Sequence, residues 1–167
     1  MKKLFLQQKL MKAKETFTVK NEMEEDCYLV EGDAIVVGGK KLHIKDMSGR
    51  EIAMVQQKLL ALLPKFLVFK NGEQVAEIVK KISLFKPKYV IEGPGWEVRG
   101  NIFEHDYIIT DGSKDIVHLH KAWLSWGDSF ELDISDNADE VMILASVLAI
   151  GCVMEAQSEA GAFNSEN

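Results

Sequence analysis

Two hydrophobic patterns divide the chain. Short segments of mixed polarity fill most of it, and one long apolar segment lies near its end. From Val141 to Met154 there is no charged residue, and Ser146 is the one clearly polar side chain. A helix that is apolar on every face must be buried on every face. The run has 14 residues, fewer than the roughly 18–20 needed to cross a bilayer. We therefore predict a buried core helix over residues 138–155.

The residues just before this segment have the features of a helix N-terminus. Asn137 is of a type favoured at the capping position, and Glu140 follows three residues later, as in a capping box. Asp139 and Glu140 also place negative charge at the positive end of the helix dipole. The sequence thus predicts that Asn137 caps the helix.

The chain before the helix is predicted to form short strands separated by turns. Leu42-His-Ile44 alternates between apolar and polar residues, and Asn71-Gly72 and Asp111-Gly112 are typical hairpin turns. Segments 51–63 and 73–85 are ambiguous, because their Leu, Ala, Lys and Gln content also suits helices.

An internal repeat favours strands for both ambiguous segments. The pattern from Ile52 to Phe66 recurs 23 residues later, from Val75 to Tyr89. Each copy follows a turn signal and leads into an obvious strand, so the unit is predicted to be strand–turn–strand.

About a dozen strands followed by one apolar helix suggest a closed barrel. Barrels of around eight strands are filled by their own side chains, whereas larger ones leave a lumen. A helix that is apolar all round would fill such a lumen, and closure removes exposed sheet edges. We predict a mainly β fold, a closed antiparallel barrel of about 12 strands around a central apolar C-terminal helix.

Several segments together carry a resemblance to a known family. They are the opening residues 1–9, Gly49-Arg50-Glu-Ile, Val75-Ala-Glu-Ile-Val-Lys-Lys-Ile, Trp96-Glu-Val-Arg-Gly100 and the final apolar helix. Through them the chain, from residue 1 to about 157, resembles the LURP-one-related proteins and their bacterial relatives of the YxjI type. This family lies in the superfamily of Tubby C-terminal domains and phospholipid scramblases. The resemblance implies a Tubby-like 12-stranded barrel around a central helix.

The resemblance implies less about function. Tubby domains bind phosphoinositide headgroups through basic residues, and scramblases act on membrane lipids. This chain matches neither a Tubby lipid-binding motif nor the cysteine-rich and calcium-binding features of scramblases. Either activity would be transferred by analogy of fold alone.

Length and composition predict one domain in a reducing compartment. The 167 residues are expected to form a single domain over 1–157, followed by a polar, disordered tail over 158–167. Cys27 and Cys152 make no disulfide framework. The basic N-terminus lacks the apolar run of a signal peptide. We therefore expect a cytoplasmic protein.

Charge is distributed unevenly along the chain. Residues 40–88 carry eleven Lys and Arg against four Asp and Glu, whereas residues 89–167 carry three against fifteen. The net charge of −6 argues against nucleic acid as a partner. In the repeats, six lysines are predicted to share a rim of the barrel: Lys58, Lys65, Lys80, Lys81, Lys86 and Lys88. They would either attract anionic lipid headgroups or keep the strand ends soluble.

The sequence offers no enzyme. No catalytic residue, glycine-rich phosphate loop or cofactor motif is present. His118 and His120 are two apart, so they share a strand face with Val117 and Leu119 on the other. We predict no metal site there, because the sequence places no further converging ligand.

Three functional hypotheses remain from the sequence, and an enzyme with an unrecognised site ranks last among them. The first is a non-enzymatic cytoplasmic binding or scaffold domain, with a protein or small ligand as its partner. The alternative is a peripheral module that binds anionic phospholipid headgroups through the lysines. Such binding is predicted to be weak and electrostatic, because no lipid anchor or exposed amphipathic helix is evident.

Overall fold

The computed structural model describes residues 1–7, 16–33, 38–124 and 127–165. Within this part of the chain, twelve strands precede one helix. The elements are β1 (Lys2–Gln7), β2 (Phe17–Lys20), β3 (Asp26–Gly32), β4 (Lys41–Asp46), β5 (Glu51–Gln57), β6 (Phe66–Lys70), β7 (Glu73–Lys81), β8 (Lys88–Glu92), β9 (Trp96–Asn101), β10 (Asp106–Thr110), β11 (Asp115–Leu124), β12 (Gly127–Ile134) and α1 (Glu140–Ser165).

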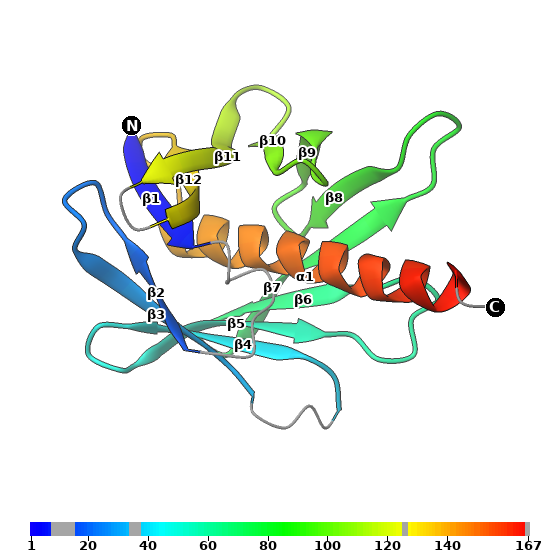
Figure 1. The fold of residues 1–167 in the computed structure, drawn as a ribbon, viewed down its shortest axis with the longest axis horizontal. Helices are drawn as coiled ribbons and strands as arrows, with labels where there is room; N and C mark the ends of the chain where they lie inside the picture. Colours follow the sequence, from blue (N-terminus) through cyan, green and yellow to red (C-terminus); the bar gives the residue numbers. More distant parts are fainter. Residues whose placement is uncertain (8–15, 34–37, 125–126, 166–167) are drawn as a thin grey trace.

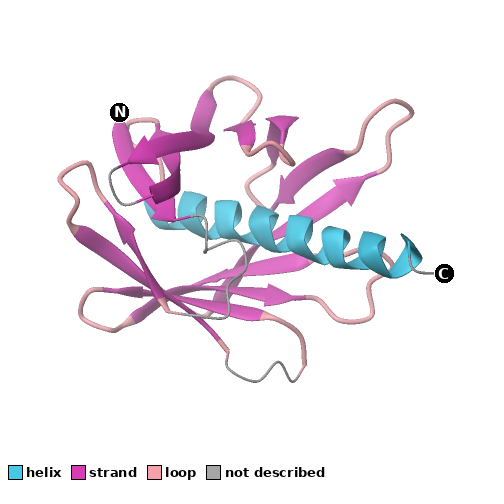
Figure 2. Cartoon of the chain, in the orientation of Figure 1, coloured by secondary structure: helices cyan, strands magenta, loops and turns pink. Residues whose placement is uncertain are grey.

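The strands form one closed antiparallel barrel. Each strand pairs with its neighbour in sequence, and β1 closes the ring by pairing along β12, from Lys2 opposite Ile134 to Gln7 opposite Ser129. The helix runs through the enclosed space, with strands on its surrounding sides (Figures 1 and 2). The predicted fold class is confirmed.

Alternation along the strands directs one face toward the helix. On β4, Leu42 and Ile44 are buried, and on β6 Phe66 and Val68 are buried, while their neighbours are more exposed. The two ambiguous segments contain strands, as the repeat predicted. These strands are shorter than the segments, however, because β5 ends at Gln57 and β7 at Lys81. The remaining residues belong to loops.

The helix occupies the core of the barrel. Ile143, Leu144, Val147, Ala149 and Ile150 have no exposed surface. Residues 140–161 are long and apolar enough to cross a membrane by length and composition, but 72% of that apolar window is buried inside the barrel. Strand side chains thus surround the helix where lipid would surround a spanning segment, as the prediction of a core helix requires.

Both ends of the helix differ from the prediction. Asn137 has a positive φ of 62° and lies in a turn, so Asp139 caps the helix instead, accepting a hydrogen bond from Met142 N at 3.1 Å. At the other end the helix continues to Ser165 rather than ending at 155. Ala156 and Gln157 favour helix, and Ser158 Oγ bonds back to the Met154 carbonyl at 3.1 Å. Residues 158–165, predicted to be disordered, are therefore helical here.

Candidate functional site

The two ends of the barrel are built from different connections. The connections after β2, β4, β6, β8 and β10 lie at the end where α1 begins, which we call the turn end. The connections after β5 and β7, residues 58–65 and 82–87, lie at the opposite end, which we call the loop end. Figure 1 shows both loops extending on the side where α1 finishes. Contacts from Lys40 to Glu155 and from Tyr89 to Gln157 attach the helix to this end.

Large apolar side chains project into solvent from the two loops. Leu60 and Leu62 are fully exposed, and Leu84 and Phe85 are 95% and 94% exposed. Leu59 and Ile82 are also exposed. Such side chains belong to a barrel core by composition, yet here they lie beyond the ends of the strands and are exposed. A cluster of exposed apolar residues on a small domain marks an interaction surface.

Sequence reasoning missed these apolar residues because it extended the strands through them. A strand over 51–63 or 73–85 would have buried every second side chain against the core. One signal was available. Both loops are apolar segments enclosed by lysine and followed by proline: Lys58-Leu-Leu-Ala-Leu-Leu-Pro64-Lys and Lys81-Ile-Ser-Leu-Phe-Lys-Pro87-Lys. Proline cannot donate to a strand ladder, so it places a loop boundary beside each apolar run.

The six lysines named from the sequence lie at the bases of these loops or within them, but most are paired. Glu77 contacts Lys58 at 3.4 Å and Lys65 at 3.6 Å. Lys81 is 2.9 Å from Glu92, and Lys88 is 2.8 Å from Glu97. These hydrogen-bonded lysines lower the pKa values of the Glu92 and Glu97 carboxyls. Each glutamate offsets part of the positive charge.

Two of the lysines have no ion pair among the described residues. Lys86 is exposed within the 82–87 loop, next to Phe85. Lys80 pairs with Tyr89 across β7 and β8. Its side chain is on the same face of β7 as the buried Ala76 and Ile78, which point into the barrel, so it lies at the mouth of the barrel. The predicted rim therefore contains four lysines that are paired with glutamates and two that remain available to an anion.

A pocket opens beside the 82–87 loop. Its volume is about 600 Å³. It lies where β8 and β9 separate, because their pairing stops at Tyr89 opposite Val98 while β9 continues to Asn101. Val98, Ile102 and Phe103 form its apolar lining, and Lys86 lies at its edge. The pocket could hold a small amphipathic group with an anionic part near Lys86.

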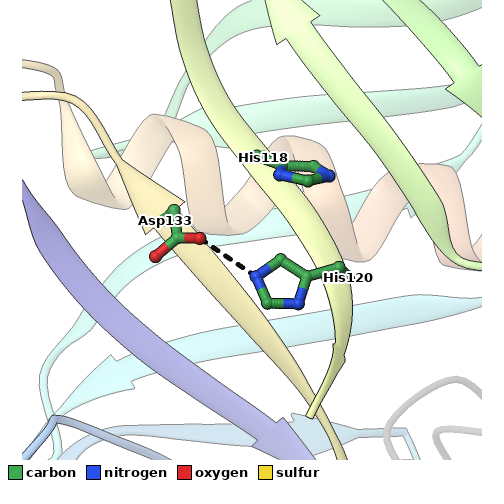
Figure 3. Close-up of side chains that lie close together, drawn as sticks. All are labelled: His118, His120 and Asp133. Atoms are coloured by element: carbon green, nitrogen blue, oxygen red, sulfur yellow. Dashed lines mark hydrogen bonds and ion pairs between the residues drawn. The ribbon is translucent and has the colours of Figure 1, made fainter.

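The outer wall of the barrel carries a second group of polar side chains. His118 and His120 on β11 are half-buried and face outward beside Asp133 of β12 (Figure 3). Val117 and Leu119 are buried on the opposite face, as predicted. The sequence prediction of no metal site rested on finding only two ligands. Asp133 supplies a third candidate, so that premise does not hold, and the prediction itself stays untested.

Neither cysteine has the environment of a nucleophile. Burial raises the pKa of the Cys152 thiol to about 12. Burial, with the nearby Glu140 carboxylate, also raises the pKa of Cys27. Both thiols are therefore protonated at neutral pH, and neither forms a disulfide.

Comparison with known proteins identifies the family. Residues 2–151 match the sequence profile of LURP-one-related proteins. The chain belongs to the LURP-one-related family. It is 34% identical over 151 residues to the uncharacterized protein YxjI of Bacillus subtilis (strain 168), a match that spans 90% of this chain and 93% of YxjI.

A solved structure supports the same fold. An Arabidopsis thaliana protein determined by X-ray crystallography superposes with a TM-score of 0.64, covering 89% of this chain and 88% of its own. At 14% identity, this likeness concerns the fold alone. Neither the family description nor the relative's name carries an enzymatic activity.

Proposed function

We propose that this LURP-one-related domain is a non-enzymatic module that docks on anionic membrane surfaces through its loop end. The observation that carries the proposal is the set of six exposed apolar side chains on the 58–65 and 82–87 loops, each loop flanked by lysines. The sequence predicted an electrostatic contact. The exposed leucines and phenylalanine add an apolar component to that prediction.

The order of residues along each loop follows the layers of a bilayer surface. The apolar side chains lie between flanking lysines, so the loop tip is apolar and its base is basic. A membrane presents anionic headgroups first and hydrocarbon beneath them. Inserted tips would place Leu60, Leu62, Leu84 and Phe85 at the acyl boundary and leave the lysines among the headgroups. A folded protein partner would offer no comparable reason for this order in both loops.

Both the apolar and the electrostatic component are large enough to contribute to membrane binding. Removing a Leu or Phe side chain from water is worth about 1.5–3 kcal/mol. A lysine near an anionic surface contributes about 1 kcal/mol. Since glutamates offset four of the six lysines, the apolar component is expected to supply most of the binding. Glu159 on the exposed end of α1 opposes approach to an anionic surface, which favours association that is reversible rather than tight.

Co-sedimentation with vesicles tests the proposal. The untagged protein should bind vesicles of phosphatidylcholine and phosphatidylserine, and should bind phosphatidylcholine alone more weakly. Higher salt should reduce binding without abolishing it, because screening affects only the electrostatic component. Replacing Leu60, Leu62, Leu84 and Phe85 together by Ser should remove binding. Absence of sedimentation with either vesicle would refute the proposal and leave a protein partner as the better hypothesis.

The turn end provides matched controls. Met23 and Met47 are exposed apolar side chains there, so Met23→Ser/Met47→Ser should bind vesicles like the wild type. For charge, Lys80→Gln/Lys86→Gln should weaken binding to anionic vesicles, whereas Arg50→Gln/Lys114→Gln at the turn end should not. Equal losses from both ends would show nonspecific adsorption.

We also propose that the protein works in the cytoplasm, at the inner face of the membrane. The anionic lipids of that leaflet suit the unpaired lysines. The two unpaired, protonated cysteines are consistent with a reducing compartment.

A further inference from the structure

The outer wall where β11 and β12 pair brings two imidazoles and a carboxylate together. His118 lies directly opposite Asp133 in the register, and His120 is diagonal to it, two residues along β11. All three side chains point outward, since Leu119 and Leu132 take the inner face. One ligand atom from each of the three lies within 4.8 Å of the others. Figure 3 shows the two rings and the carboxylate facing a common space on the barrel surface.

One pair of ligand atoms already has the spacing found around a bound transition metal, and the third lies within 4.8 Å of both. Zinc holds nitrogen and oxygen ligands at about 2.0–2.1 Å in tetrahedral geometry, which places the ligand atoms roughly 3.3 Å apart. His120 Nε2 and Asp133 Oδ2 are already 3.0 Å apart. The two imidazole centroids are 4.9 Å apart. Small rotations of exterior side chains would bring the third ligand atom into place.

Each imidazole is oriented through one ring nitrogen, which leaves the other as a ligand. His118 Nε2 is 2.8 Å from Asp106 Oδ1 on β10, so Nδ1 remains. His120 Nδ1 is 3.2 Å from the Lys121 carbonyl, so Nε2 remains and faces Asp133. Metal-binding histidines are commonly held in this way, with the second nitrogen donating to a carboxylate or a backbone carbonyl.

The surrounding charges are compatible with a dication. Lys3 Nζ is 3.2 Å from Asp133 Oδ1 and also pairs with Glu131, so it occupies the carboxylate oxygen that faces away from His120. Among the described residues, the carboxylates of Asp106, Glu131 and Asp133 contact the histidines or Lys3, whose ammonium group is paired with Glu131 and Asp133. The excess negative charge favours a bound cation, while Lys3 moderates its affinity.

We propose that His118, His120 and Asp133 bind one Zn²⁺ ion on the barrel wall, with water completing its coordination. This set of two imidazoles and one carboxylate is of the kind that zinc accepts with an open position. The site lies on β11 and β12, away from the loops that would contact a membrane. Its existence is therefore independent of vesicle binding.

Calorimetric titration of the untagged, metal-free protein with zinc chloride tests the site. The wild type should bind one equivalent of Zn²⁺, and the ion should raise the thermal midpoint. His118→Ala/His120→Ala should lose saturable binding. Asp106→Asn should weaken the affinity about tenfold while keeping the stoichiometry, because Asp106 only orients His118. The visible spectrum of Co²⁺ bound in place of zinc should report nitrogen ligands and disappear with the double variant.

His43 provides a matched control. It also contacts two carboxylates, Glu51 at 2.6 Å and Asp33 at 2.9 Å, but these lie at opposite ring nitrogens and do not converge. His43→Ala should therefore leave zinc affinity unchanged. The proposal is overturned if the wild type shows no saturable binding. It is equally overturned if zinc binds the His118→Ala/His120→Ala protein as tightly as the wild type.

Discussion

The two ends of the barrel differ in how their connections are specified. At the turn end, short polar side chains hold the backbone. Asp46 Oδ1 accepts hydrogen bonds from Ser48 N at 3.0 Å and Arg50 N at 3.1 Å, and Asn21 Oδ1 accepts from Met23 N at 2.9 Å. Asp111 forms the same type of turn. These three turns thus contain their own stabilising contacts.

The loop end lacks such contacts in its two apolar loops. Within the described residues 59–64 and 82–87, no side chain forms a hydrogen bond to the backbone. The 58–65 loop is closed by Lys58 N, which donates to the Lys65 carbonyl at 2.9 Å. Six large apolar side chains point into solvent instead. The turn end is therefore held by polar contacts of its own, whereas the two loops of the loop end expose apolar side chains that contribute little buried surface to the barrel.

The largest effect is expected from the helix that joins the two ends. Ala149 has no exposed surface, whereas Ala160 on the same helix is exposed beyond the barrel. Ala149→Arg should place an unpaired charge in the core and prevent soluble folding, at a cost of several kcal/mol. Ala160→Arg should express and unfold like the wild type. A soluble Ala149→Arg protein with an unchanged urea midpoint would contradict the central position of the helix.

A smaller but clear loss is expected at a turn-end glycine. Gly93 has a φ of 113°, and an added Cβ would lie 2.2 Å from the Val75 carbonyl oxygen. Gly93→Ala should therefore reduce the free energy of unfolding by about 2 kcal/mol or more. Gly95, in the same turn, has a φ of 73° and open space around it. Gly95→Ala should cost only about 1 kcal/mol, the strain of the left-handed backbone. Similar urea midpoints for the two variants would argue against the close approach at Gly93.

Acid should weaken the turn end through the helix cap. Burial alone would raise the pKa of Asp139, but hydrogen bonds from Lys70 and Met142 N lower it below its ordinary value. A lowered carboxyl pKa in the folded state stabilises at pH values above the unfolded pKa of about 3.9, and this stabilisation is lost as pH falls through the folded pKa.

Asp139→Asn should separate the effect of the negative charge from the effect of the capping hydrogen bond. Asn still caps a helix well, so stability at pH 7 should fall only slightly, by up to about 1 kcal/mol from the lost charge. Denaturation measured between pH 7 and pH 2 should show a shallower acid loss in the variant than in the wild type. An identical acid dependence would mean that other carboxylates, such as Asp46 and Asp111, carry it.

Much of the fold could be predicted from the sequence because it depends on patterns that the chain repeats. The uniformly apolar run before Glu155 indicated a buried helix, and the repeat after Ile52 favoured strands. Together these two patterns predicted a barrel around a helix. The ends of the helix and strands were harder to predict from the sequence. Asn137 and Asp139 are both good caps by type, and only the turn geometry, with Asn137 at positive φ, decides between them.

Apart from the prolines that follow the two apolar loops, the candidate sites depended on strand ends and registers that the sequence does not show directly. Leu60 and Leu84 look like core residues by composition, and the ends of β5 at Gln57 and of β7 at Lys81 place them in solvent. The pairing of Lys58 with Glu77 depends on the register between β5, β6 and β7. Asp133 joins His118 through the β11–β12 register, which sequence spacing alone does not reveal.

The smallest effect on stability is expected at the loop end, and it tests the comparison most directly. Leu60, Leu62, Leu84 and Phe85 contribute little buried surface to the folded state, so replacing all four by Ser removes few native contacts. Surface substitutions of this kind usually change stability by less than about 0.5 kcal/mol each. The four-residue variant should therefore unfold near the wild-type urea midpoint, whereas the single substitution Leu42→Ser, at a buried strand position, should lower it markedly. If the variant instead loses as much stability as Leu42→Ser, the loops support the barrel and their apolar residues need no partner. If stability is retained while vesicle binding disappears, the exposed side chains serve contact with a membrane rather than the fold.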